Sequence, residues 1–361
     1  MIEPSDELIY ADYAAASPVY EEVLKAMQPY WQNQFYNPSG LSRQSRSIRE
    51  VIESCRATVA KILQVKSNEI IFTSGATESN NLVINTFYQI GNFGVAAIEH
   101  PSILEPSRAH GGTEFPVDEK VQPIIGDEQL KAFSVAAVNH ELGTIQNLRR
   151  IKQALPVDCY LHTDASQAVL CQPLASIMRH CDYLSLNGGK IGGPKGSGCL
   201  AVRNGSPFSS LWFGGSQEQG RRPATENVPA IVGFSKALEI TQNKAVQTNQ
   251  KLFELRDYFL EQLRQKSIPF IDNANTKTSP HIVSLQFPDH DGERLLLELD
   301  AHGIIVATGS ACTASDDLPS HVLLAVGLSE KQANATLRFS FSSQMSTKQV
   351  DKIVEAFVDI T

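Results

Sequence analysis

The feature that most constrains the fold is a series of short apolar segments separated by helical patterns. The strand-like segments are EIIFT from Glu69, GVAAI from Gly94, FSVAAVN from Phe133, DCYLHT from Asp158, DYLSL from Asp182 and CLAV from Cys199. Between them apolar residues recur at three- and four-residue spacing, as from Val51 to Leu63. Near-continuous apolar strands that alternate with helices are typical of a mainly parallel sheet covered by helices on both faces. We therefore predict an α/β protein.

The pattern changes near residue 240. The amphipathic stretch ITQNKAVQTNQKLFELRDYFLEQLRQK predicts one long helix that bridges two lobes. After it come the strand-like pieces HIVSLQF, GIIVATG and ATLRFSF, and a closing helix with an apolar face that includes Val350 and Phe357. We predict a large domain over residues 15–250 and a smaller α+β domain formed by residues 1–14 and 251–361.

The charge of the chain restricts its partners. The net charge of -8 over 361 residues argues against a general nucleic-acid binder and against a binder of anionic membranes, because both need a basic face. No apolar run approaches the roughly 20 residues that span a bilayer. The N-terminal residues MIEPSDELIY open acidic and lack the basic and apolar regions of a secretory signal, so we expect a cytoplasmic protein.

Six cysteines occur without any CxxC pair, which argues against a metal site and a disulfide framework. Cys159 and Cys199 lie in strand-like runs, and we expect them to be buried thiols. Cys312 differs, because the segment TGSACTASDD places no bulky apolar residue within four positions of it. The composition predicts a solvated loop that presents this thiol to a reaction or a partner.

The segment EIIFTSGATESNNL leads from a strand into a helix through Gly75, Ala76 and Thr77. Glycine lets a backbone approach a ligand, and the free amides at a helix start, with the Thr77 hydroxyl, suit a phosphate. A plain capped helix is the alternative interpretation.

Two further motifs provide a carboxylate and an amine. In LHTDASQAV, Asp164 follows an apolar strand at the place where α/β proteins bind ligands, although it could also be an N-cap. In LSLNGGKIGGPKG, Lys190 lies in a glycine-rich turn, for which a flexible surface loop is the alternative. A lysine, a carboxylate and an anion site are together the groups that pyridoxal phosphate requires.

The order of the motifs resembles a known family. The segments YADYAAASPV, FTSGATESNNL, EHPSIL, HTDASQ, GPKG, RRPATENVP, TGSACTAS and LRFSF resemble those of the cysteine desulfurases, which are class V aminotransferases and fold type I pyridoxal-phosphate enzymes. The segment LPSHVLLAVG after the Cys312 loop is similar to the long-loop group that serves iron–sulfur cluster assembly and nitrogen fixation. The resemblance covers nearly the whole chain.

The resemblance implies roles for the residues around the cofactor. Lys190 resembles the lysine that forms the Schiff base, and Asp164 the partner of the pyridinium nitrogen. Gln167 resembles the residue that hydrogen-bonds the phenolic oxygen of the cofactor. His100 resembles the imidazole that stacks on the ring and both accepts and returns a proton.

Further implied roles concern the phosphate and the substrate. Thr77 matches a phosphate ligand, and Thr225 resembles the threonine that binds the phosphate of the partner subunit, which requires a homodimer. Arg338 resembles the arginine that clamps the substrate carboxylate. By the same resemblance, Cys312 is the nucleophile that takes sulfur from L-cysteine as a persulfide, leaves alanine, and passes the sulfur to an acceptor or scaffold protein.

The chain departs from the family pattern at the cofactor pocket. In VNHELG, His140 replaces the asparagine that reaches the cofactor ring or the substrate carboxylate, and Asn139 is the other candidate for that contact. Before the lysine, Asn187 and Gly189 stand where the family has serine and histidine, so we expect fewer phosphate contacts. Three functions remain open: a cysteine desulfurase with a modified pocket, a related enzyme such as a selenocysteine lyase or an aminotransferase, and a non-catalytic interaction protein.

Overall fold

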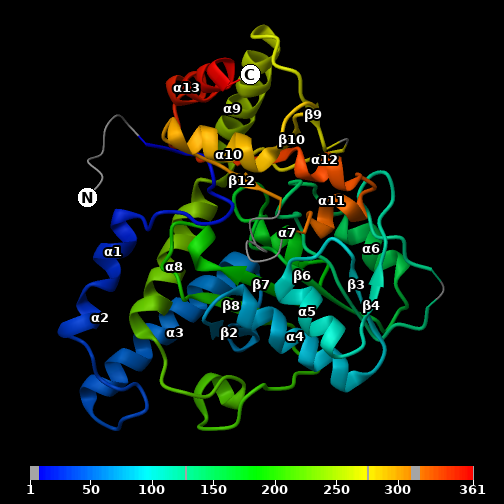
Figure 1. Cartoon of the computed structure of the whole chain (residues 1–361). Coiled ribbons are helices and arrows are strands. Elements are labelled where there is room, and N and C mark those ends of the chain that lie inside the picture. The colour runs from blue at the N-terminus through cyan, green and yellow to red at the C-terminus, as the bar shows by residue number, and fades with distance from the viewer. Residues whose placement is uncertain (1–7, 127, 275, 310–317, 361) are drawn as a thin grey trace.

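The computed structural model describes residues 8–126, 128–274, 276–309 and 318–360, and its larger part is built on a seven-stranded sheet (Figure 1). The strands, in spatial order, are β2 (Ile70–Thr73), β8 (Gly198–Val202), β7 (Tyr183–Asn187), β6 (Tyr160–Asp164), β5 (Ala132–Ser134), β3 (Phe93–Ala96) and β4 (Thr113–Phe115). β8 is antiparallel to both of its neighbours, and the other neighbouring pairs are parallel. The predicted α/β class with a mainly parallel sheet is confirmed.

Helices bury both faces of this sheet. Ile70 and Phe72 of β2 belong to one apolar core, whereas the intervening Ile71 belongs to a second core on the other face. Successive strand residues point to opposite faces of a sheet. The consecutive apolar residues Ile70, Ile71 and Phe72 in EIIFT are therefore explained by burial of the sheet on both faces. The first core receives α3 (Arg43–Leu63), α6 (Leu148–Ala154), α7 (Leu174–Met178) and α8 (Val228–Asn243), and the other receives α4 (Ala76–Ile90) and α5 (Pro101–Ala109).

A second, smaller sheet lies above the large one in Figure 1 and has its own apolar core. Its strands, in spatial order, are β12 (Ala307–Thr308), β13 (Thr336–Ser340), β10 (Ile282–Gln286) and β9 (Ile271–Asp272). α9 (Ala245–Gln265), α10 (Gly292–Ala301) and α13 (Thr347–Ile360) pack on it, with Phe259, Phe339 and Phe357 at the centre of the core. β1 (Ile9–Tyr10) joins this part by pairing with β11 (Ile304–Ile305).

The remaining elements are short. They are α1 (Glu21–Met27), α2 (Pro29–Gln32), α11 (His321–Ala325), α12 (Glu330–Asn334) and the 3-10 turns η1 (Ser67–Glu69), η2 (Gly188–Lys190) and η3 (Gln217–Gly220). α11 and α12 follow the Cys312 segment, yet Val322, Leu323 and Ala333 pack into the core of the large sheet. Within the described ranges, no helix is both long enough and apolar enough to cross a membrane.

The prediction of one continuous bridging helix was wrong. α8 ends at Asn243 and α9 begins at Ala245, because Lys244 leaves the helical conformation at φ -101° and ψ 1°. Leu238 of α8 packs into the core of the large sheet, whereas Leu252 of α9 packs into the core of the small one. A straight helix would have to bury one continuous apolar face against both cores. The break at Lys244 lets α8 and α9 each point its apolar face toward its own core.

Candidate functional site

Polar side chains gather where strands of the large sheet end. β6 ends at Asp164, and β7 ends at Asn187 directly before the turn η2 that carries Lys190. His100 follows β3 and begins α5. The carboxyl ends of parallel strands are the usual ligand site of open α/β sheets, so these side chains converge for a topological reason.

The Asp164 carboxylate is held by two donors. Its Oδ1 accepts a hydrogen bond from the backbone amide of Ser166 at 2.9 Å, and its Oδ2 accepts one from Asn80 Nδ2 at 2.8 Å. His162 lies two residues before Asp164 on β6, and Ser134 and Ser185 hold its two ring nitrogens by hydrogen bonds. Burial lowers the pKa of this histidine. The carboxylate therefore has a fixed orientation.

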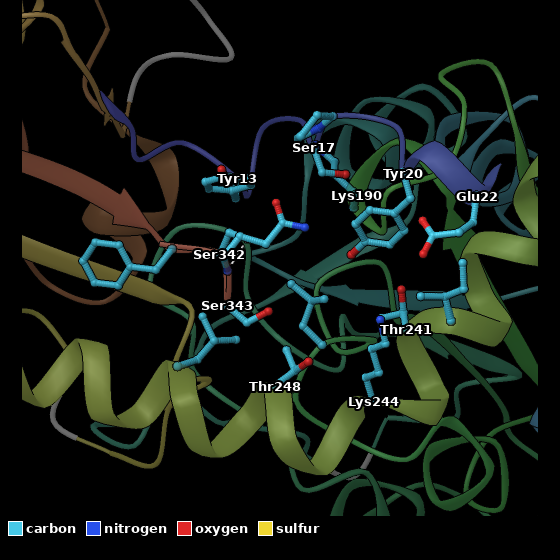
Figure 2. Close-up of a pocket in the computed structure, with 16 residues that line it drawn as sticks. Tyr13, Ser17, Tyr20, Glu22, Lys190, Thr241, Lys244, Thr248, Ser342 and Ser343 are labelled. Carbon is cyan, nitrogen blue, oxygen red and sulfur yellow. Dashed lines mark hydrogen bonds between the residues drawn. The ribbon is translucent and has the colours of Figure 1, made fainter. Parts of the chain in front are cut away.

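Lys190 contacts the N-terminal segment. Its Nζ donates to the carbonyl oxygen of Ala15 at 2.5 Å, and its side chain lines a cavity of about 210 Å³. Figure 2 shows Lys190 beside this cavity with Tyr20 and Thr241, the latter from α8. Neither Asp164 nor His100 lines this cavity, but the charge of Lys190 acts on the His100 imidazole. Lys195, the other lysine of the glycine-rich segment, is exposed, so Lys190 is the better-placed amine.

The start of α4 lacks a side-chain cap. Its N-cap residue, Gly75, has a φ of +147°, a value that residues with a Cβ rarely adopt. A Cβ at Gly75 would lie 3.9 Å from Asn187 Oδ1. That oxygen accepts from the amide of Gly189 at 3.1 Å, so the amide nitrogen of Asn187 is the atom that can donate to a ligand. The uncapped helix start with Ala76 and Thr77 and the Asn187 side chain together suit an anion.

Gln167 connects the two sheets. Its Nε2 donates to the carbonyl oxygen of Ala14 at 2.9 Å, and its Oε1 lies 3.2 Å from Nε2 of His281, directly before β10. Burial lowers the pKa of His281 to about 3, and Ser279 lies 2.5 Å from its Nδ1. A neutral His281 that accepts from Ser279 donates to Gln167 and thereby fixes the orientation of the amide.

Two histidine rings lie side by side at the site. His100 and His140 have ring centroids 5.1 Å apart at an angle of 72°. Burial lowers the pKa of both imidazoles, although the Asp164 charge opposes this for His100. Both rings are therefore neutral at neutral pH.

Arg338 reaches the site from the small sheet. Its Nη1 donates to the carbonyl oxygen of His140 at 3.0 Å, and its Nη2 to Asp12 Oδ1 at 2.7 Å. Its Nε and the Nε2 of His140 are buried and have no hydrogen-bond partner among the described residues. The nearest carboxylate oxygen to His140 Nε2 is Glu141 Oε1 at 3.6 Å, which is too far for a hydrogen bond. Both nitrogens could therefore hydrogen-bond a bound carboxylate or ring oxygen.

Asn139 is a turn residue in this structure. Its Nδ2 donates to the carbonyl oxygen of Ile98, and its Oδ1 accepts from the amides of Glu141 and Leu142, each at 2.9 Å. The side chain thus has backbone partners at both ends. Between Asn139 and His140, His140 is the residue with an unpaired polar atom for a ligand.

Thr225 lies apart, exposed in the loop between β8 and α8. The residue before it, Ala224, has a φ of +92°. A buried ion pair holds the loop against α3, because Arg56 Nη1 of that helix lies 2.6 Å from Glu218 Oε2 of η3. The exposure of Thr225 is compatible with a contact to a second chain.

Cys312 lies outside the described residues. The cysteines that the structure does describe are buried or half-buried, and burial raises the thiol pKa of each. The prediction that Cys159 and Cys199 are buried is confirmed. None of the described thiols is therefore a ready source of thiolate.

Sequence reasoning missed the residues that hold the site residues in place. Asn80 and Ser102 were inside quoted motifs, but nothing in their spacing indicated contacts to Asp164 and His100. Asp12 and His281 are far in sequence from their partners Arg338 and Gln167. Only the fold could identify these contacts.

The sheet and the cluster of lysine, carboxylate and uncapped helix start define a fold type I α/β protein. The family model described as Aminotransferase class-V matches residues 9–353, and the chain belongs to this family.

Several curated relatives extend over nearly the whole chain. A cysteine desulfurase IscS of Dictyoglomus turgidum is 37% identical and covers 92% of this chain and 89% of its own length. A cysteine desulfurase IscS 1 of Archaeoglobus fulgidus is 36% identical, with 96% and 95% covered. Among solved structures, a NifS-like protein aligns with a TM-score of 0.91 at 28% identity and covers 98% of this chain and 99% of its own. SspA in complex with cysteine aligns with a TM-score of 0.81 at 28% identity, covering 94% of this chain and 100% of its own.

Proposed function

We propose that this chain is a pyridoxal-phosphate-dependent cysteine desulfurase, which converts L-cysteine to L-alanine and carries the sulfur as a persulfide on Cys312. The observation that carries the proposal is the cluster of Lys190, Asp164 and His100 at the strand ends of a class V aminotransferase fold. The names of the relatives support the choice of cysteine as substrate.

The donor set fits the cofactor. The uncapped α4 start at Gly75, Ala76 and Thr77, with Asn187, would hold the phosphate. Gln167 would meet the phenolic oxygen and Asp164 the ring nitrogen. When bound, pyridoxal phosphate supplies an electron sink that stabilises negative charge on the substrate carbon.

The side chains of the site have separate tasks. The Asp164 carboxylate, fixed by Ser166 and Asn80, would supply the negative charge that favours a proton on the ring nitrogen of the bound cofactor. The Lys190 amine would be the covalent attachment point of the cofactor. His100 provides an uncharged imidazole at the face of the site.

The substrate carboxylate would be bound by Arg338. Its Nη2 pairs with Asp12, whereas its Nε has no hydrogen-bond partner among the described residues. The guanidinium group therefore still has a donor that a carboxylate could accept from. His140, neutral because it is buried, would add a hydrogen bond rather than a charge. His140 is the departure from the family pattern on the substrate side of the pocket, and the proposed substrate remains an α-amino acid.

Cys312 is the proposed nucleophile. The described cysteines have thiol pKa values raised by burial, which makes them poor candidates. The sequence around Cys312 consists of small and acidic residues, from which we expect no such apolar burial of its thiol. Its sulfur would pass to an acceptor protein in iron–sulfur cluster or thio-cofactor assembly.

We further propose a homodimer in which Thr225 of each chain approaches the phosphate of the other. Exposed large apolar residues support an interface: Trp31, Phe35, Leu41 and Phe213 are 63%, 69%, 91% and 99% exposed. The domain division at residues 14/15 and 250/251 also stays a prediction. The two apolar cores support it except at α11 and α12, whose buried residues belong to the core of the large sheet.

Replacement of the lysine tests the site. Lys190→Ala is expected to abolish the visible absorbance that the purified protein acquires with pyridoxal phosphate, whereas the matched variant Lys195→Ala should keep it. Absorbance that survives in Lys190→Ala and disappears in Lys195→Ala would refute the assignment.

A further inference from the structure

Hydrogen bonds around Nδ1 of His100 fix where the neutral imidazole carries its proton. His100 is the N-cap of α5, and the backbone amide of Ser102 donates to Nδ1 at 3.1 Å. A backbone amide can only donate, so Nδ1 must offer a lone pair. The hydrogen of the neutral ring is therefore on Nε2.

The Ser102 hydroxyl supplies a second donor to the same atom. Its Oγ lies 2.9 Å from His100 Nδ1 and accepts from Asn80 Nδ2 at 2.9 Å. Since the amide NH₂ of Asn80 cannot accept, the hydroxyl hydrogen is directed to Nδ1. Nδ1 thus accepts from both the amide and the hydroxyl of one residue.

Asn80 gives this arrangement its direction. Its second N–H donates to Asp164 Oδ2 at 2.8 Å, and the residue is fully buried. A reversed amide would place its oxygen against the carboxylate, which is unfavourable. The hydrogen bonds therefore run in one sense, from Asn80 to Asp164 on one side and through Ser102 to His100 on the other.

We propose that Ser102 is a positioning residue that holds His100 in the Nε2–H tautomer, so that the neutral imidazole presents Nε2–H to the reacting groups as a hydrogen-bond donor. This refinement rests on the proposed function and narrows the expected role, in which His100 both accepts and returns a proton. To accept a proton at Nδ1, the ring would have to give up both hydrogen bonds from Ser102. The Nε2–H group requires no such rearrangement.

Other groups that act on the imidazole come from separate elements. They are Asp164 of β6, Lys190 of η2, His140 after β5, His321 of α11 and Arg338 of β13. Only Asp164 favours the charged ring, and burial disfavours it more strongly. All of these residues stay unchanged when Ser102 is replaced, so a difference between variants reports on Ser102.

The test is ¹⁵N NMR of histidine-labelled full-length protein saturated with pyridoxal phosphate and without substrate, with His100 assigned through His100→Gln. Two-bond ¹H–¹⁵N correlations separate the tautomers. The wild-type protein is expected to show the Nε2–H form at neutral pH. A major Nδ1–H form would overturn the proposal, and this measurement needs no variant at Ser102.

Variants then isolate the hydroxyl. A neutral hydrogen bond contributes about 0.5–1.5 kcal/mol, so Ser102→Ala is expected to raise the pKa of His100 by roughly half to one unit. Ser102→Thr should restore the wild-type titration. The matched control is Ser107→Ala, which removes another buried hydroxyl of α5 that has no partner among the described residues. An unchanged His100 titration in Ser102→Ala, or an equal shift in Ser107→Ala, would refute the role of Ser102.

The NMR experiment tests the role of Ser102, and an activity assay tests the proposed function, so that a failure of one can be distinguished from a failure of the other. An Nδ1–H tautomer in a protein that releases sulfur from L-cysteine would remove only the role of Ser102. An Nε2–H tautomer in a protein without desulfurase activity would leave the tautomer assignment intact and contradict the proposed function.

Discussion

Glu99 is a fully buried carboxyl group, and its replacement should change how stability depends on pH. Its Oε1 accepts from the amide of Ala136 at 2.8 Å, while Oε2 has no partner among the described residues. Burial raises the pKa to about 8 from 4.5, and the charge of Asp164 adds to the effect. Between these two values the folded protein keeps a proton that the unfolded chain releases, so the stability falls as the pH rises.

The size of this effect follows from the two pKa values. The difference between about 8 and 4.5, at about 1.4 kcal/mol per pH unit, amounts to about 5 kcal/mol once the pH exceeds the folded value. Glu99→Gln imitates the protonated group and keeps an oxygen for Ala136. We therefore expect the advantage of the variant over the wild type to grow from about 1.4 kcal/mol at pH 5.5 to about 5 kcal/mol at pH 9.

Urea unfolding of both proteins at pH 5.5, 7, 8 and 9 measures this difference. Other titrating groups are common to both proteins and cancel in the comparison. A difference that stays constant, or that shrinks as the pH rises, would refute a raised pKa at Glu99.

Three further substitutions test separate parts of the account. Ala224→Gly should stabilise the protein by about 0.5–1 kcal/mol in urea unfolding. The strain that glycine relieves at this positive φ exceeds the extra conformational entropy that glycine loses on folding. A loss of stability would contradict backbone strain at Ala224. Glu218→Gln removes the buried one of the two carboxylates that pair with Arg56 and should cost about 3–5 kcal/mol. The control Glu53→Gln removes the exposed carboxylate and should cost less than about 1 kcal/mol, and equal costs would refute the reasoning. Gly189→His should tighten pyridoxal-phosphate binding about tenfold or more, because the imidazole adds a hydrogen bond to the phosphate. The site has room for a side chain, since the nearest contacts of a Cβ would be Asn187 at 3.5 Å and Lys195 at 3.6 Å. Equal or weaker binding would mean that the phosphate is already fully held.

The elements that the sequence predicted best are those with one dominant physical cause. The run EIIFT predicted β2 because burial on both faces demands continuous apolar residues. The spacing from Val51 to Leu63 predicted α3, and the stripe with Val350 and Phe357 predicted α13. The break at Lys244 was not predictable, because the helical pattern continues through it and only the two separate cores require a change of direction.

The candidate site shows the same limit. Asp164 and Lys190 were identifiable because strand ends and glycine-rich turns are recognisable in a sequence. The tautomer of His100 was not identifiable, because it depends on where the amide of Ser102 points and on a contact with Asn80, 22 positions from Ser102. Sequence analysis gave the types of groups, and folding gave the direction of each hydrogen bond.

The most direct test of the central claim is the product balance of the reaction with L-cysteine. With pyridoxal phosphate and a thiol reductant present, the wild-type protein is expected to release alanine and sulfide in equal amounts over many turnovers. Cys312→Ser should still bind the cofactor, yet release no sulfide, because a hydroxyl is a much poorer nucleophile toward sulfur than a thiolate. Undiminished sulfide release by Cys312→Ser, or the absence of alanine from the wild-type reaction, would contradict the account.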